Sequence, residues 1–466
     1  MAPPRRKCFI GIVAFQGANY KVLENYIAWA FHLGRRLPDW DFLLRVIGKK
    51  EQFRARNNLV DMAKAWLTGP DDVLLMLDDD MILPQNTFER LVKVLDDHPD
   101  AGLVGGLYWQ RGGSYRPVIQ KIVHKFDGVG LEWYAPHEIT GEVMQVGVVG
   151  GGCLLFPIRT LKALMPPVFW IDGIVGTDIH VCARINQAGF NVYCDTGLEL
   201  GHHMEGQVLT HKTLPPQLIK FSKYAQKLEE AACEYLKMNR QELETYQLNH
   251  LWTLEENWLT KPRETFEDIA EAYLEVGNIA VARNVYYAIH SGTGIEGFSD
   301  IIDAIDKGMI KRDYPCLDYG CGVGVATEIL AQAGYQVESM DLADSAVLKF
   351  LDWRINQNGI KDKVKILPVI SDMPEFQNKY SFVIMLDVIE HLMNPHELLN
   401  EILSRLAPGG HFHSNFAVLD FKGADEGVHQ HLKRITLSEF DELMQKHRMV
   451  PVGTFLFQKA REAENG

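Results

Sequence analysis

Cysteines are few in this sequence, and long hydrophobic runs are lacking. The 466 residues include 7 cysteines, an odd number without paired spacing, which excludes a secreted disulfide scaffold and predicts reduced thiols in a cytoplasmic compartment. No apolar run approaches the roughly 18–20 residues that a membrane span requires. The apolar stretch at residues 8–15 is short and leads directly into patterned sequence, so we expect a buried first strand there and not a signal peptide.

Positive charge is also scarce. Lysine and arginine total 47 against 61 aspartates and glutamates, which gives a formal net charge of −14. A chain with this balance binds phosphate backbones poorly, so nucleic acid is disfavoured as a partner, although a local basic groove is left open. Internal repeats and low-complexity tracts are absent from the sequence, and 47% hydrophobic with 23% charged residues is typical of a globular protein, which excludes collagen and coiled coils.

The order of apolar and polar segments predicts an α/β protein with two Rossmann-like domains joined by a helical segment. The boundaries are expected at residues 1–210, 211–312 and 313–466. In the first domain, alternating strands and helices indicate a largely parallel sheet. Its strands are expected at residues 9–15, 42–47, 73–77 and 146–156, and its helices at 20–32, 56–67 and 86–95. Strands of the last domain are expected at residues 316–319, 337–341, 364–368, 382–386 and 411–415.

The middle segment has helical periodicity. Apolar residues from Leu218 to Tyr235 recur at the spacing of one helix face. Thr265 and Asp268 have the spacing of a capping box, and Gly277 is a stop for the helix that follows. This segment is either a connector or a lid over the last domain.

Three carboxylates follow the first domain's most hydrophobic strand. Asp78-Asp79-Asp80 comes directly after residues 73–77, at the end of a strand where open α/β sheets bind ligands. Adjacent carboxylates repel one another unless a cation screens them, and Mg²⁺ is commonly held by one or two carboxylates together with diphosphate oxygens. The alternative is a solvated acidic loop.

With their surroundings, these aspartates resemble the DxD motif of glycosyltransferases of the GT-A fold and their family 2 relatives. The resemblance covers residues 7–203. It implies that Asp78 and Asp80 hold Mn²⁺ or Mg²⁺ and reach the ribose of a nucleotide-diphosphate sugar. It also implies that Arg56 and Asn57, at the start of a helix, face the nucleotide. The alternative for Arg56 is a surface charge.

Two later positions complete the first candidate site. Asp178 precedes a predicted helix at residues 179–188, where the family's acid deprotonates the acceptor hydroxyl, which favours inversion; Thr177 replaces the preceding acid of the family, and a helix N-cap is the alternative role. His202 or His203 is expected to complete the metal shell. The glycines at residues 150–152 either bring the backbone close to the sugar or acceptor, or permit tight packing.

A glycine-rich loop marks the second candidate site. Gly320, Gly322 and Gly324 lie between a predicted strand and a predicted helix, and Val325 takes the position where a dinucleotide fingerprint needs its last glycine or alanine, so NAD is disfavoured. Asp341 lies at the tip of the next strand, where it could accept hydrogen bonds from ribose hydroxyls.

Residues 314–457 resemble a class I S-adenosylmethionine-dependent methyltransferase in motif order. The stretch from Asp387 to His391 is most similar to small-molecule O-methyltransferases of the ubiquinone-biosynthesis type. Imidazole is suited to take up the acceptor's proton near neutral pH. The alternative for His391, with Glu390, is the cofactor's periphery, and the alternatives for His429 and His431 are a surface turn or a metal site. The resemblance implies that S-adenosylmethionine is bound by Asp318, Gly320, Gly322, Gly324, Asp341, Asp372 and Asp387, with His391, His429 and His431 as candidate bases.

Together the two sites predict a bifunctional enzyme. The first domain would transfer a sugar from a nucleotide-diphosphate sugar to an acceptor hydroxyl, and the last would methylate an oxygen of the same glycan or acceptor. One alternative is that either domain is a non-catalytic carbohydrate- or nucleotide-binding module, and another is modification of a hydroxylated nucleic-acid base. The donor sugar, the acceptor, the methylated atom and the oligomeric state are left open.

Overall fold

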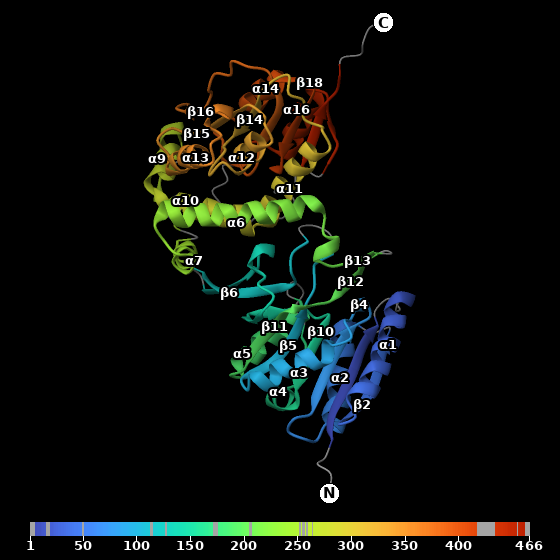
Figure 1. Cartoon of the computed structure of the whole chain (residues 1–466). Coiled ribbons are helices and arrows are strands. Elements are labelled where there is room, and N and C mark those ends of the chain that lie inside the picture. Colours follow the sequence, from blue (N-terminus) through green and yellow to red (C-terminus); the bar gives the residue numbers. More distant parts are fainter. Residues whose placement is uncertain are drawn as a thin grey trace. The chain divides into compact units, whose positions relative to one another are not determined.

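The computed structural model divides into two units (Figure 1). The first contains Met1–Val123 and Val129–Pro215, and the second contains His124–Gly128 and Pro216–Gly466. Within the described residues, no helix is both long and apolar enough to cross a membrane. The structure describes residues 5–14, 19–48, 51–111, 115–125, 128–170, 176–204, 207–250, 253, 257, 260–262, 264–416, 434–453 and 455–461.

A seven-stranded mixed sheet forms the first unit. Its order is β2-β1-β3-β10-β5-β11-β8, and β10 is antiparallel to both of its neighbours, so the prediction of a largely parallel sheet was wrong. The predicted single strand at 146–156 was also wrong: glycines at 147 and 150–152 divide that region among three strands. The bounds are β1 Arg6–Ala14, β2 Trp40–Gly48, β3 Val73–Asp78, β5 Ala101–Leu107, β8 Val143–Val146, β9 Val148–Val149, β10 Cys153–Pro157 and β11 Asn191–Glu199.

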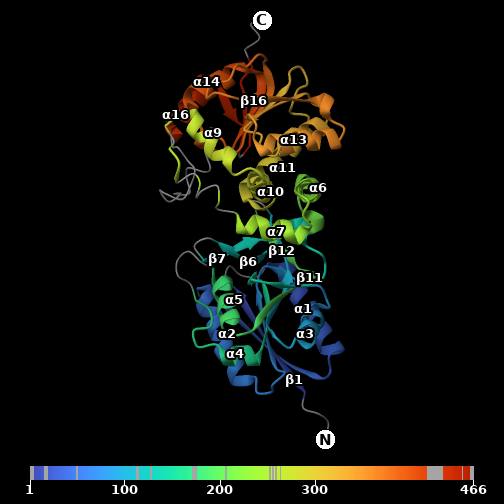
Figure 2. The ribbon, with the colours of Figure 1, turned by 90° about the vertical axis from the view of Figure 1, so that its left-hand side faces the viewer.

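Helices cover both faces of this sheet because its central strands are apolar on both sides. Along β3, Leu74 and Met76 enter one core with α2 (Gln52–Trp66), α4 (Ile158–Ala163) and α5 (Thr177–Gln187). Leu75 and Leu77 enter the opposite core with α1 (Tyr20–Arg36) and α3 (Thr87–Asp97). Figure 2 shows these two helical layers on either side of the sheet.

Two small sheets complete the first unit. Strand β12 (Gly201–Met204) lies between β13 (Gln207–Leu209) and β4 (Met81–Ile82). This pairing sets His202 opposite Met81 and therefore next to the aspartates that follow β3. The other sheet contains β7 (Gly128–Trp133), β6 (Ile119–Lys125) and β9.

The second unit contains a seven-stranded sheet of order β16-β15-β14-β17-β18-β20-β19. Neighbouring strands from β16 to β18 are parallel, whereas β20 is antiparallel to both β18 and β19. The order reverses between β14 and β17, which is where a doubly wound sheet binds its ligand. The bounds are β14 Cys316–Tyr319, β15 Val337–Leu342, β16 Val364–Val369, β17 Tyr380–Met385, β18 Leu406–Ser414, β19 Met449–Pro451 and β20 Leu456–Lys459.

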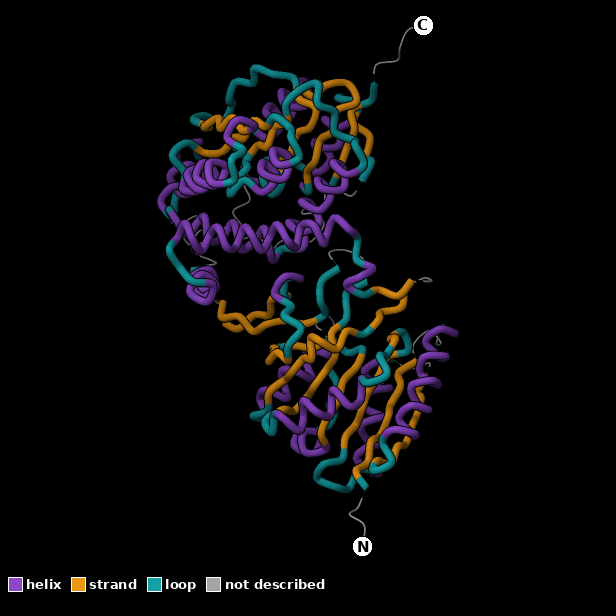
Figure 3. Tube along the Cα trace, viewed as in Figure 1, coloured by secondary structure: helices purple, strands orange, loops and turns teal. Residues whose placement is uncertain are grey.

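The helical segment packs within the second unit (Figure 3). The helix predicted from Leu218 onward is confirmed as α6, and the Thr265–Asp268 capping box is confirmed at the start of α9. Tyr224 of α6 donates to Glu328, which also pairs with Arg354 at 2.5 Å, so α6 is joined to the sheet's helices through a buried ion pair. The helices are α6 Pro216–Leu236, α7 Arg240–Asn249, α9 Phe266–Glu275, α10 Asn278–His290, α11 Gly292–Asp306, α12 Val325–Gln332, α13 Ala346–Gln357, α14 Pro395–Arg405 and α16 Leu437–Lys446.

Candidate active sites

The glycine loop of the second unit joins β14 to α12 at the point where the strand order reverses. Gly320, Gly322 and Gly324 all have positive φ angles, of 70°, 51° and 77°. A Cβ at Gly320 would lie 2.5 Å from Cγ2 of Val388, in the segment that follows β17. The loop therefore needs glycine both for its left-handed backbone and for its close packing on this segment.

Asp341 fixes the middle of that loop from the end of β15. Its Oδ2 accepts a hydrogen bond from the Gly322 backbone N–H at 2.7 Å, and its Oδ1 accepts one from Leu342 at 2.8 Å. Burial raises the pKa of the carboxyl, and these two hydrogen bonds oppose part of that effect. Each oxygen of a carboxylate can accept a second hydrogen bond, which suits ribose hydroxyls.

Asp318 supports the same loop from behind. Its Oδ2 accepts hydrogen bonds from the backbone N–H and the hydroxyl of Thr327, at 3.0 and 2.6 Å. Burial raises the pKa of this carboxyl to about 6, although the Thr327 contacts lower it. These contacts tie β14 to the first turn of α12, and a direct contact between Asp318 and a cofactor stays a prediction.

The segment after β17 has a backbone conformation that is rare for a side-chain-bearing residue. Asp387 has a φ of 53°, and reciprocal hydrogen bonds hold it to Asn415: its N–H donates at 2.9 Å, and the Asn415 amide donates back to Oδ1 at 2.6 Å. Asn415 follows the neighbouring strand β18, and no local pattern in the sequence indicated its contact with Asp387. Strain of this kind costs on the order of 1–3 kcal/mol and is concentrated at functional sites.

Glu390 and His391 follow on the same segment. Burial, and then the charge of Asp387, raise the pKa of Glu390 to about 8. His391 Nε2 lies 3.9 Å from Glu390 Oε1, and its Nδ1 lies 3.2 Å from the hydroxyl of Tyr273 on α9. The packing of Val388 on Gly320 brings the start of this segment against the glycine loop.

The other residues predicted for this site are Asp372, His429 and His431. Asp372 follows β16 and accepts a hydrogen bond from the Asn394 side chain. His429 and His431 lie outside the described residues. Asn284 of α10, which the sequence did not indicate, has its side-chain oxygen 3.1 Å from the position that a Cβ on Gly322 would take.

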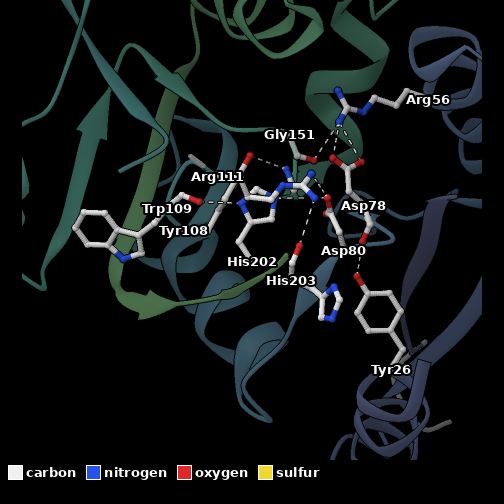
Figure 4. Close-up of polar contacts among 11 residues, drawn as sticks. Tyr26, Arg56, Asp78, Asp80, Tyr108, Trp109, Arg111, Gly151, His202 and His203 are labelled. Atoms are coloured by element: carbon white, nitrogen blue, oxygen red, sulfur yellow. Dashed lines mark hydrogen bonds and ion pairs between the residues drawn. The ribbon is translucent and has the colours of Figure 1, made fainter. Parts of the chain in front are cut away.

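In the first unit, Arg56 and Asp78 form a buried ion pair. Nη2 of Arg56 lies 3.1 and 3.0 Å from the two carboxylate oxygens of Asp78 (Figure 4), and Nη1 donates to the Thr177 hydroxyl. Burial raises the pKa of Asp78, although Arg56 opposes this, and the charges of Asp80 and Asp178 raise it further. Thr177, which replaces an acid of the resembling family, therefore has a definite partner in this cluster.

Asp178 lies in the first turn of α5. The helix begins at Thr177 and its N-cap is Gly176, so the alternative role of Asp178 as the N-cap was wrong. Its charge also raises the pKa of the buried Tyr108 hydroxyl, after the larger effect of burial. The structure thus brings Asp178, Arg56 and Asp78 into one cluster.

Asp80 lies against a histidine and a second arginine. His202 Nε2 is 3.4 Å from Asp80 Oδ2, while its Nδ1 is 2.8 Å from the Trp109 carbonyl oxygen. Arg111, which the sequence did not indicate, donates to Asp80 at 2.6 Å. Burial alone would raise the pKa of Asp80, but the His202 contact and the Arg111 charge lower it.

The His203 side chain does not take part in the contact between His202 and Asp80. Its ring points away from His202, as expected for adjacent residues of a strand, and only its backbone N–H contacts Asp80, donating to the carbonyl oxygen at 2.8 Å (Figure 4). Among the described residues, no group of three or more His, Cys, Asp or Glu side chains is arranged to hold a metal ion. A cation at Asp80 would therefore need ligands from a substrate or water.

Asn57 and the three glycines have structural contacts. The Asn57 amide accepts from and donates to the backbone of Phe169, at 3.0 and 2.8 Å. A Cβ on Gly150, Gly151 or Gly152 would lie within 2.8 Å of Tyr108, Arg56 or Met81, so tight packing explains this glycine run.

Comparisons with known proteins concern mainly the second unit. Residues 295–448 match a family model described as a methyltransferase domain. The ubiquinone biosynthesis O-methyltransferase of Bordetella avium is 32% identical over 94 residues, covering 20% of this chain and 39% of that protein. The Shewanella halifaxensis protein of the same name is 26% identical over 157 residues, covering 33% and 58%.

The chain thus spans 39% and 58% of the lengths of these two relatives. Among solved structures, A197 from STIV has 16% identity and a TM-score of 0.31, covering 44% of this chain and 91% of that one. The strand order, the glycine loop and the family match define a class I S-adenosylmethionine-dependent methyltransferase domain in the second unit.

Proposed function

We propose that the second unit transfers a methyl group from S-adenosylmethionine to an oxygen atom of a small acceptor. The observation that carries the proposal is the glycine loop at the reversal of the strand order, with Asp341 bound to its Gly322 N–H at 2.7 Å. The ubiquinone biosynthesis O-methyltransferases that the chain resembles favour a hydroxyl as the acceptor group.

The residues present fit this cofactor. The glycines leave the loop without side chains where a ligand's backbone contacts are needed, and Asp341 retains acceptor capacity for ribose hydroxyls. Asp372, which follows β16, is proposed to reach the adenine amino group. S-adenosylmethionine supplies an activated methyl group on a sulfonium, so alignment and removal of one proton suffice.

His391 is the proposed base among the described candidates. The side chain of His391 is 22% exposed, whereas that of Glu390 beside it is 5% exposed. An acceptor hydroxyl can therefore approach the imidazole more readily than the carboxyl. The Asp387–Asn415 pair holds the segment that carries both.

Calorimetric titration of the full chain with S-adenosylmethionine and S-adenosylhomocysteine tests this proposal. We expect binding of both, and transfer of a labelled methyl group to a phenolic or sugar hydroxyl from an acceptor panel. Failure to bind either compound would overturn the proposal.

We further propose that the first unit transfers a sugar from a nucleotide-diphosphate sugar to an acceptor hydroxyl. The specific observation in favour is the placement of Asp80, His202 and the Arg56–Asp78–Asp178 cluster together at the end of β3. In this proposal Asp178 takes the acceptor's proton, and a single displacement with inversion follows.

The residues at Asp80 fit a divalent cation that is completed by its substrate. The Trp109 carbonyl can hold a proton on His202 Nδ1, so Nε2, which contacts the Asp80 carboxylate, can give up its own proton and turn its lone pair toward a cation bound beside Asp80. Two protein ligands are too few for a closed site but suit Mn²⁺ or Mg²⁺ bound with diphosphate oxygens and water. Such a cation would stabilise the charge of the departing diphosphate.

Release of nucleoside diphosphate from a panel of UDP-, GDP- and dTDP-sugars, with Mn²⁺ and with chelator, tests the sugar transfer. We expect metal-dependent release from one donor, and its loss in Asp80→Ala but not in the exposed Asp96→Ala. Silence across the panel, even with acceptor hydroxyls present, would favour a binding module that serves the methyltransferase.

The two reactions are proposed to share an acceptor, because sites on one chain meet a common substrate at high effective concentration. Methylation rates on glycosylated and on bare acceptor test this coupling. We expect faster methylation of one of the two, and equal rates would rule the coupling out.

A further inference from the structure

Helix α9 contributes a side chain to the methyltransferase site although it lies outside residues 295–448, the part that matches the family model. Tyr273, in the last turn of α9, has its hydroxyl 3.2 Å from Nδ1 of His391. The two rings also meet edge to face, with centroids 6.3 Å apart and an interplanar angle of 86°. The contact joins residues that are 118 positions apart in the sequence.

Tyr273 packs in a small hydrophobic core. Ile269 and Ala272 are 6% and 0% exposed, and they form a small core with Tyr273 and with Met393, two residues beyond His391. The capping box at Thr265 fixes the start of the helix. The Tyr273–His391 contact is therefore held by the same core that holds the segment after His391.

The other side of the imidazole faces a carboxyl. His391 Nε2 lies 3.9 Å from Glu390 Oε1, and burial raises the pKa of Glu390 to about 8. At neutral pH this carboxyl keeps its own proton, so it does not require an N–H donor from the imidazole. The ring proton is then best placed on Nδ1, where the Tyr273 oxygen can accept it.

We propose that Tyr273 is a positioning residue whose hydroxyl oxygen accepts a hydrogen bond from His391 Nδ1–H, so that Nε2 keeps the lone pair which takes the acceptor's proton. The inference rests on the proposed methyl transfer. The proton that the acceptor hydroxyl loses as its oxygen is methylated moves to Nε2, and the resulting imidazolium later releases a proton to water. The helical segment before residue 295 thus completes the site.

Long-range proton–nitrogen NMR of the deuterated full chain, labelled with ¹⁵N-histidine and bound to S-adenosylhomocysteine, tests this proposal. The spectrum reports which ring nitrogen carries the proton, and His391→Gln identifies the signal. Tyr273→Phe removes the hydroxyl and keeps the ring. Tyr246→Phe is the matched control, because Tyr246 also packs against a histidine, His250, but on α7.

We expect the His391 Nδ1–H form to predominate in the wild type and in Tyr246→Phe, and to lose its predominance in Tyr273→Phe with unchanged affinity for S-adenosylhomocysteine. A wild-type Nε2–H form, or an unaltered His391 signal in Tyr273→Phe, would overturn the proposal. Absence of S-adenosylhomocysteine binding in the wild type would instead contradict the proposed methyl transfer, so the two failures are distinguishable.

Discussion

The two candidate sites differ in the groups that hold their carboxylates. In the first unit, Asp78 is paired with Arg56 at 3.0 Å, and Asp80 is paired with Arg111 at 2.6 Å. In the second unit, Asp341 is held by two backbone N–H groups, those of Gly322 and Leu342. Both sites place an acid at the end of a buried parallel strand. Among the described residues, Asp78 and Asp80 are paired with guanidinium groups, whereas Asp341 accepts from backbone N–H groups.

This difference agrees with the chemistry proposed for each unit. A departing nucleoside diphosphate is strongly anionic, so its site needs cationic groups that stay ordered when the substrate is absent, and buried ion pairs provide them. Ribose hydroxyls are neutral donors, and a carboxylate oriented by backbone N–H groups accepts from them without a counter-ion. An acid at the end of a buried strand therefore indicates a different ligand according to the charged groups around it.

The largest expected effect is on the ion pair of the first unit. Arg56→Met removes the partner of Asp78 and leaves a buried carboxylate unpaired, which should lower the stability of this unit by about 3–5 kcal/mol. Hydrogen exchange of β3, measured by mass spectrometry, reports the unit separately from the other. Arg35→Met, at an exposed position, is the control, and adding Asp78→Asn to Arg56→Met should recover part of the loss. An unaltered β3 would show that the pair is not structural.

The glycine loop should be the most sensitive part of the second unit. Gly320→Ala combines a left-handed backbone with a Cβ 2.5 Å from Val388, which together cost about 3 kcal/mol, and S-adenosylhomocysteine should bind about 100-fold more weakly. Gly359→Ala is the matched control: its φ is also positive, at 64°, but no atom lies within 4 Å of the added Cβ. Equal affinities in titration calorimetry would contradict the role of the loop.

A smaller, pH-dependent effect is expected at Glu390. Its pKa is raised to about 8 in the folded protein, so the stability associated with its proton is present below the ordinary glutamate pKa and is lost as the pH rises through about 8. Glutamine cannot ionise, so Glu390→Gln should match the wild type at pH 5 and exceed its stability by about 2–3 kcal/mol at pH 9. Denaturant unfolding at both pH values checks this, and a constant difference would mean that Glu390 is ionised throughout.

The sequence predicted those parts of the two sites that depend on local pattern. The strand and helix around Gly320 and the acid at the end of β15 are local features, and the structure has them where they were expected. The continuous apolar run at 146–156 was misleading, because hydrophobicity does not distinguish one strand from several short ones separated by glycines. Because of the same error, β10 was not predicted as a separate strand, and its antiparallel direction was missed.

Contacts between distant segments could not be predicted. Arg111 reaches Asp80 across 31 positions, and Tyr273 reaches His391 across 118. Neither residue belongs to a recognisable spacing, since each contact depends on how distant segments of the chain fold against one another. A single sequence contains the charges of such pairs but not their distances.

The smallest expected effect separates the two adjacent histidines of the first unit. His202 faces Asp80 with its Nε2 and is oriented through Trp109, whereas the His203 ring lies on the other side of β12. His202→Asn should therefore weaken Mn²⁺ binding in the presence of UDP by about tenfold, close to 1.4 kcal/mol, while His203→Asn should leave it unchanged. Titration followed by the electron paramagnetic resonance of free Mn²⁺ measures both.

Because the two substitutions are chemically identical and adjacent, a selective loss at His202 would sharpen the contrast between a cation-dependent first site and a second site built from backbone. Equal losses at both positions would indicate a change in β12 itself, and no loss at either would remove His202 from the proposed metal site.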